Sequence, residues 1–110
     1  MDEIREIERR LWLEGAEAFE RHMAVECIMA FAPMGVMRNA TIVGSLREAP
    51  RWTGVTFSDE AFARPAETVA VFAYRAAAQR NSADYTALCT STYVRADGEW
   101  RIAQHQQTAA

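Results

Sequence analysis

Apolar residues recur at helical spacing over the first part of the chain. They form one side of a predicted helix: Ile4, Ile7, Leu11 and Ala18. The opposite side carries charged residues: Glu3, Glu6, Arg9, Arg10 and Glu14. Asp2 can cap this helix at its N-terminus, and Gly15 is expected to end it. Ala16 to His22 then predicts a second, shorter helix with Phe19 and Met23 as its buried contacts.

From Ala24 the pattern changes to alternation, which is typical of a β-strand. The apolar set of this strand consists of Val25, Cys27, Met29 and Phe31. Pro33 and Gly35 are expected to end the strand, and residues 37–41 predict a short return strand. A third helix is predicted over residues 42–49, before Pro50 stops it.

The rest of the chain is rich in β-forming residues. Four strands are predicted, over residues 53–63, 68–77, 85–95 and 100–108. Turns are expected at Arg64 to Ala66 and at Asn81-Ser82, and Asp97-Gly98 is a strong hairpin signal. Helices followed by a run of antiparallel strands indicate an α+β fold, and we expect one domain over residues 1–110.

Composition narrows the functional classes. The chain has 110 residues and a net charge of −3, so neither nucleic acid nor an anionic membrane surface is an expected partner. All 12 basic residues are arginine, which excludes a Schiff-base lysine and a phosphate-loop lysine. No apolar run reaches membrane-spanning length and the first residues are charged, so we expect a cytoplasmic protein.

The cysteines and histidines show no metal-binding spacing. Cys27 and Cys89 are expected to be reduced thiols in the core, and neither a C-x-x-C nor an H-E-x-x-H motif occurs. We therefore expect no metal and no cofactor.

The C-terminal segment carries a family resemblance. The run from Tyr93 to Thr108, with the Leu11-Trp12 helix and the Ala73-Tyr74 strand, resembles the nuclear transport factor 2-like superfamily. Within it, the chain is similar to the small SnoaL-like (polyketide cyclase-like) bacterial proteins of mostly unknown function. The resemblance implies a cone, in which a strongly curved mixed or antiparallel sheet wraps around the N-terminal helices. It also implies an apolar pocket in the cone and a homodimer formed through the outer face of the sheet.

The same tail resembles the association domain of calcium/calmodulin-dependent protein kinases. The pocket arginines of that domain would fall on Ala76, Ser91 and Gln107 here, so its anion-binding pocket is not expected. The alignment and strand alternation place one set of side chains on the pocket side: Phe72, Tyr74, Cys89, Ser91, Tyr93, His105 and Gln107.

Candidate catalytic groups are few. Enzymes of this superfamily generally place a carboxylate inside the cone, but Asp59 is the one aspartate within a predicted strand, and it is expected to be exposed. Glu26 is expected on the face opposite the apolar set of its strand. His105 is therefore the candidate for acid/base catalysis near neutral pH, or else a structural residue held by hydrogen bonds.

The predicted ligand-binding residues combine aromatic and polar side chains. They are Trp52, Tyr74, Ser91, Tyr93, His105 and Gln107. Trp52 serves either as an aromatic wall at the pocket mouth or in helix-to-sheet packing, and Tyr74 either donates to a ligand or is satisfied internally. Four methionines line a pocket or fill the core: Met23, Met29, Met34 and Met37.

Three functional hypotheses remain open from the sequence. The first is a homodimeric protein that binds a small apolar molecule. The second is a SnoaL-like or ketosteroid isomerase-like enzyme (isomerase, cyclase or dehydratase) that uses His105. The third is a non-catalytic dimerisation module, for which the outer sheet face would be the contact: Thr86, Leu88, Thr90, Thr92 and Val94, with Trp100 and Ile102 beside it.

Overall fold

The computed structural model describes residues 1–110, and the chain begins with helices α1 (Asp2–Glu14) and α2 (Ala16–His22). Gly15 joins them with φ 63° and ψ −126°, a conformation that a residue without a Cβ adopts at little cost. These bounds agree with the prediction from the sequence. The N-cap position, however, is Met1, and Asp2 lies in the first turn, where its carboxylate pairs with Arg5.

A short hairpin and a third helix follow. Strands β1 (Met23–Phe31) and β2 (Gly35–Arg38) pair antiparallel, and helix α3 (Asn39–Glu48) begins directly after β2. The predicted return strand over residues 37–41 is therefore shifted toward the N-terminus, because Asn39 starts the helix.

Four long strands complete the chain: β3 (Gly54–Ala66), β4 (Val69–Arg80), β5 (Ala83–Ala96) and β6 (Glu99–Ala109). They pair antiparallel in sequence order, whereas β1 pairs parallel with β6. The mixed sheet therefore has the order β2-β1-β6-β5-β4-β3. The turn predicted at Arg64 to Ala66 lies within β3 instead.

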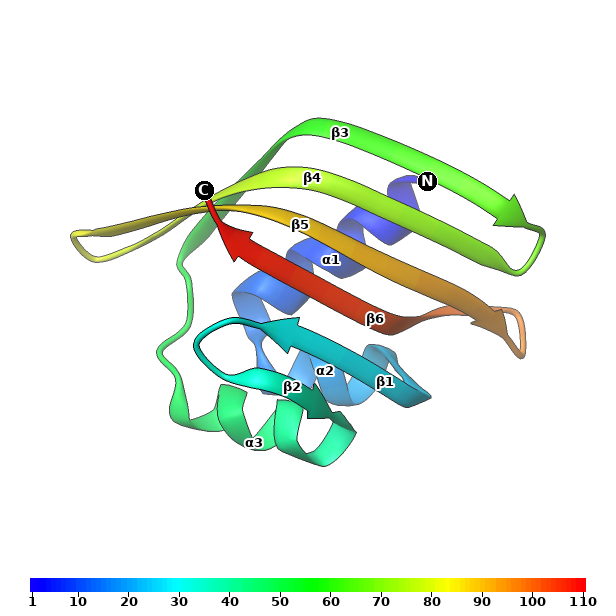
Figure 1. Ribbon diagram of the computed structural model, residues 1–110, viewed down its shortest axis with the longest axis horizontal. Helices are drawn as coiled ribbons and strands as arrows, with labels where there is room; N and C mark the ends of the chain where they lie inside the picture. Colours follow the sequence, from blue (N-terminus) through cyan, green and yellow to red (C-terminus); the bar gives the residue numbers. More distant parts are fainter.

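The sheet arches over the helices, with α1 under the long strands and α2 and α3 near β1 and β2 (Figure 1). One core fills the space between these layers, and its fully buried large side chains include Ile4, Ile42, Phe72, Tyr93 and Ile102. This is the α+β architecture that the sequence pattern predicted, with the curved mixed sheet that the family resemblance implied. None of the helices combines the length and the apolar character needed to cross a membrane.

A bulge in β6 corrects one prediction about the sheet faces. Thr92 pairs with Gln104 but Tyr93 pairs with Ile102, so Ala103 is an extra residue on β6. The bulge shifts the alternation by one, and residues on both sides of it face the helices. Trp100 and Ile102 are consequently buried, at 5% and 0% exposure, and the prediction that they lie on the outer face is wrong.

A second irregularity corrects the predicted apolar set of β1. The register against β6 shifts between Met23 and Ile28, and Val25 is 96% exposed while Cys27 is buried. The Asn39 side chain holds this irregular segment, because its Oδ1 accepts from the Cys27 amide at 2.9 Å and its Nδ2 donates to the Ala24 carbonyl at 3.0 Å.

Candidate functional site

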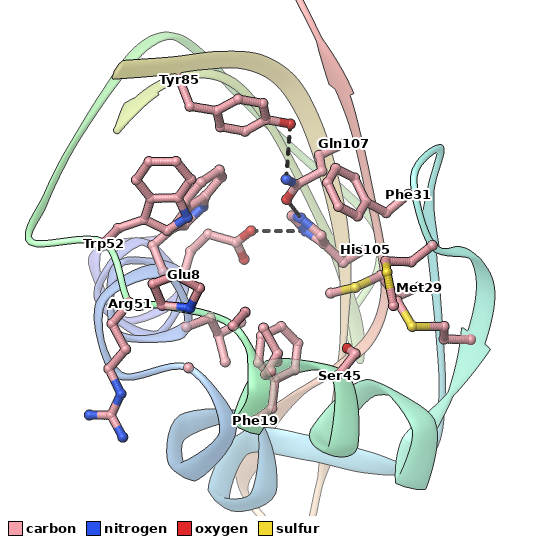
Figure 2. Close-up of a pocket in the computed structure, with 18 of the residues that line it drawn as sticks. Glu8, Phe19, Met29, Phe31, Ser45, Arg51, Trp52, Tyr85, His105 and Gln107 are labelled. Carbon is pink, nitrogen blue, oxygen red and sulfur yellow. Dashed lines mark hydrogen bonds and ion pairs between the residues drawn. The ribbon is translucent and has the colours of Figure 1, made fainter. Parts of the chain in front are cut away.

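A cavity of about 410 Å³ opens between the helices and the sheet (Figure 2). Three helices, strand β1, the segment from Ala49 to Trp52 and the ends of β4, β5 and β6 contribute to its wall. Most of that wall is apolar: Leu11, Trp12, Phe19, Met29, Phe31, Met34, Met37 and Leu46. The volume lies within the range of small-molecule sites in proteins.

One carboxylate lies at the floor of this cavity. Glu8 is 0% exposed and projects from the apolar side of α1. Its Oε2 accepts hydrogen bonds from the Tyr74 hydroxyl at 2.6 Å and the Ser91 hydroxyl at 2.6 Å. Its Oε1 accepts from the Tyr93 hydroxyl at 2.5 Å. Three hydroxyl donors favour an ionised carboxylate at this site. A protonated carboxyl group would place its own O–H among these donors, whereas the ionised form accepts at both oxygens.

His105 supplies the opposite charge. Its Nδ1 lies 3.3 Å from Glu8 Oε2 and 2.7 Å from Ser91 Oγ. Since the Ser91 proton is directed to Glu8, the Ser91 oxygen accepts from Nδ1, and His105 carries a proton there. Burial lowers the pKa of His105. The hydrogen bond and the charge of Glu8 together raise it by more than burial lowers it, so the pKa lies above its ordinary value.

The pKa of Glu8 shifts in the complementary direction. Burial raises it, and the hydrogen bond and charge of His105, with the hydroxyls of Ser91 and Tyr74, lower it to below its ordinary value. Both shifts favour the ion pair of Glu8 carboxylate and His105 imidazolium. The same burial and carboxylate raise the pKa values of Tyr74 and Tyr93 well above 10.0, which keeps these phenols protonated as donors.

The second ring nitrogen of His105 is directed to Gln107. Nε2 lies 2.9 Å from the Gln107 Oε1, and the Gln107 Nε2 donates to the Tyr85 hydroxyl at 3.2 Å. A glutamine amide can present either its oxygen or its nitrogen to a neighbour. Gln107 can therefore partner His105 both when Nε2 carries a proton and after it has given that proton away.

Aromatic rings cover one side of the cavity (Figure 2). Trp52 and Tyr85 stack with centroids 5.5 Å apart and planes 16° apart, and Trp12 lies 6.3 Å from each. Trp12 also donates from Nε1 to the Tyr74 hydroxyl at 2.9 Å. The aromatic wall is thus connected by hydrogen bonds to the carboxylate at the floor.

Thiol and metal chemistry find no support here. Both cysteines are buried and free, and burial raises the pKa of Cys27 to about 11 and that of Cys89 to about 12, so both remain thiols. No group of three or more metal-ligating side chains of His, Cys, Asp or Glu occurs. The arrangement instead suits binding of an apolar molecule beside a protonated imidazole, with proton transfer through Nε2 as its available chemistry.

The structure divides the predicted site residues into two groups. Trp52, His105 and Gln107 line the cavity. Tyr74, Ser91 and Tyr93 lie behind it and hold Glu8 in place. Asp59 and Glu26 are exposed, as expected. Three of the four methionines line the cavity, whereas Met23 packs against the core.

Glu8 was missed in the sequence analysis, although a signal for it exists. It follows Ile4 by four residues and precedes Leu11 by three, so it shares the apolar side of the helix. A charged residue in that stripe indicates a buried, partnered group. Nothing in the sequence indicated that its partner would come from β6.

Comparisons with known proteins identify the fold. No family model and no curated protein matches the sequence. A candidate ketosteroid isomerase from Parabacteroides distasonis superposes with a TM-score of 0.82 at 16% identity, over 97% of this chain and 85% of that chain. A nuclear transport factor 2-like protein of unknown function in nutrient uptake from Rhodospirillum rubrum gives 0.81 at 18% identity, over 96% and 94%.

The association domain of C. elegans CaMKII is a third structure of this kind, with a TM-score of 0.78 at 10% identity over 96% of this chain and 88% of that chain. These likenesses define the class: the protein has the nuclear transport factor 2-like fold. The resemblance noted in the sequence is confirmed at the level of the fold.

Proposed function

We propose that this protein binds a small molecule with a mostly apolar body in the cavity that His105 and Gln107 line. The observation that supports it is the contrast within the wall, where apolar and aromatic side chains surround one polar cluster. Such a combination of a hydrophobic wall and a few convergent polar groups is typical of ligand sites.

Native mass spectrometry, with denatured spectra for comparison, tests this proposal. We expect non-covalent mass on the purified protein, or on protein incubated with 4-phenylbutanamide. The Ser45→Phe variant should lose it, because this side chain lines the cavity and a phenyl group would occupy the space. Ser58→Phe on the exposed surface of β3 is the matched control and should keep it. Wild-type protein that carries no ligand in either experiment would contradict the proposal.

We also propose that the protein acts as a homodimer through the convex face of the sheet. Uncharged side chains of β1, β5 and β6 form a continuous patch on that face, with Arg38 and Arg75 on the flanking strands opposite Ile28 and Leu88. The patch consists of Ile28, Ala30, Leu88, Thr90, Thr92, Gln104 and Gln106. Leu88 and Ile28 are 47% and 39% exposed there. An uncharged centre bordered by charged residues is typical of an interface, which combines an apolar core with a polar rim.

A second candidate function is proton-transfer catalysis by His105, as in an isomerase, cyclase or dehydratase. The observation that favours it is the buried Glu8–His105 pair, because a carboxylate behind an imidazole orients the ring and stabilises its charged form. The structural similarity to a candidate ketosteroid isomerase agrees with this second function. It concerns the fold alone, and the activity of that protein is not transferred to this chain.

The isomerisation of a β,γ-unsaturated ketosteroid to the conjugated enone tests the second candidate. Turnover by the wild-type protein is expected to fall by roughly 10²- to 10⁴-fold in His105→Asn. Circular dichroism of the variant separates a lost proton transfer from a lost fold. A folded wild-type protein that converts neither this substrate nor polyketide-like ketones would leave ligand binding as the function.

A further inference from the structure

Besides the imidazolium of His105, three charged side chains line the cavity: Glu8, Arg51 and Arg80. Glu8 is at the floor, whereas Arg51 and Arg80 come from the mouth. Glu8 is neutralised by His105 at 3.3 Å. The two arginines therefore determine the net charge that a ligand meets when it enters, and this charge is positive.

Arg80 is held in place but is not neutralised. Its guanidinium carbon lies 4.2 Å from the centroid of the Trp52 ring, and its Nη1 donates to the Pro50 carbonyl at 3.4 Å. The guanidinium forms no ion pair, although five other arginines do: Arg5, Arg10, Arg47, Arg75 and Arg101. Along the paired strands β4 and β5, the acidic residue nearest to Arg80 is Asp84, which lies opposite Gln79. It forms no ion pair with Arg80. The other N–H donors of the Arg80 guanidinium are therefore free to bind a ligand.

Arg51 adds a second positive charge at the same rim. In Figure 2 its side chain points away from the cavity, and it also lines a neighbouring hollow with Glu17 and Glu20, without an ion pair to either. It contributes through its charge, whereas Arg80, stacked on the aromatic wall, offers an oriented planar fork.

We propose that the ligand of this cavity is an amphipathic monocarboxylate, whose carboxylate binds Arg80 at the mouth while its apolar body extends inward. This inference rests on the proposed function and names the class of molecule that the same cavity takes. A guanidinium fork matches the two oxygens of a carboxylate, and one fork with one neighbouring charge suits a monoanion.

The orientation follows from the charges at the two ends. A ligand carboxylate at the floor would have to share the single imidazolium of His105 with Glu8, and two carboxylates sharing one site repel each other. At the mouth it meets the guanidinium of Arg80, which forms no ion pair within the chain. The inner wall around Phe19, Met29 and Phe31 is apolar and suits a hydrocarbon or aromatic body, and the methionine gives it an adaptable surface.

Isothermal titration calorimetry with two matched pairs of probes tests the inference: 4-phenylbutyrate against 4-phenylbutanamide, and octanoate against octanamide. Each pair differs in charge but hardly in shape. The wild-type protein should bind each acid on the order of tenfold tighter than its amide. In Arg80→Met the acid and the amide should bind with equal affinity.

Arg75→Met is the matched control. Arg75 lies on the same strand but pairs with Asp59 at 3.4 Å on the outer surface, and it does not line the cavity. It should keep the preference for the acid. Equal binding of acid and amide by the wild-type protein would overturn the inference and leave the proposed function standing. A preference that survives in Arg80→Met, or the absence of binding for all four probes, would also overturn it.

Discussion

At Glu8 an ionised carboxylate is fully buried, accepts three hydroxyl hydrogen bonds and faces an imidazolium. Burial of a charge is costly unless partners compensate it, and each partner here comes from the sheet. The residue therefore joins the first helix to three strands through polar contacts in the core.

Replacement of Glu8 should show how much the fold depends on this cluster. Glu8→Gln removes the charge opposite His105, and the amide can accept from the surrounding hydroxyls at only one atom. We therefore expect a loss of about 3 kcal/mol in the free energy of unfolding. Urea denaturation measures it. Glu6→Gln, on the exposed side of the same helix, is the control and should change the stability by less than about 0.5 kcal/mol.

The ion pair also sets a pH window for stability. Glu8 has a lowered pKa, so its contribution is present above 4.5 and is lost as the pH falls through its folded pKa. His105 has a raised pKa, so its contribution is complete below 6.5 and is lost as the pH rises through its folded pKa. The contribution of the pair should therefore be greatest between these two values.

The difference in unfolding free energy between the wild type and Glu8→Gln, measured from pH 4 to pH 9, checks this window. Taking the difference removes the contribution of His22, whose pKa is lowered by burial and whose pH dependence has the opposite sign. A difference that does not change with pH would contradict the assignment of the pair.

At the scale of elements, the helix and strand positions followed from the sequence more closely than the faces of the strands. The spacing of Ile4, Ile7 and Leu11 predicted helix α1, and the Asp97-Gly98 turn predicted the β5–β6 hairpin. Both signals depend only on residues that are close together in the sequence. The Ala103 bulge was not predictable in this way, since it exists only relative to β5. His105 and Gln107 were assigned to the correct face, whereas Trp100 and Ile102, on the other side of the bulge, were not.

Two glycines with different conformations offer a test at this scale. Gly15 has φ 63° between α1 and α2, and Gly44 lies on the exposed side of α3, each with no atom within 4 Å of an added Cβ. Gly15→Ala should destabilise by about 1–3 kcal/mol through backbone strain. Gly44→Ala should stabilise by roughly 0.5–1 kcal/mol, because alanine favours a helix interior. Chemical denaturation of both variants measures the contrast, and equal effects would contradict the distinction.

At the scale of the whole molecule, the two sides of the sheet differ in character. The concave side carries the buried ion pair and the cavity, and the convex side carries the uncharged patch of β1, β5 and β6. The proposed dimer would leave the cavity mouth open, because the two features lie on opposite sides of the sheet.

Sedimentation velocity at micromolar concentration tests the proposed dimer. The wild type is expected at twice the chain mass of 12.4 kDa. Leu88→Arg should shift it to the monomer, since a second arginine opposite Arg75 places uncompensated charge in the contact. Ala66→Arg, at the exposed end of β3, is the control and should remain dimeric. A monomeric wild type would refute the dimer.

The parallel pairing of β1 with β6 has a consequence for biosynthesis. β6 lies between β1 and β5 in the sheet, yet the ribosome makes it after the other helices and strands of this fold. Until residues 99–109 emerge, β1–β2 and β3–β5 cannot be joined, and Glu8 lacks its imidazole. The cavity and the continuous sheet are thus completed together, when β6 is added. Until then the nascent chain exposes the unpaired edges of β1 and β5, a state in which a chaperone would recognise it.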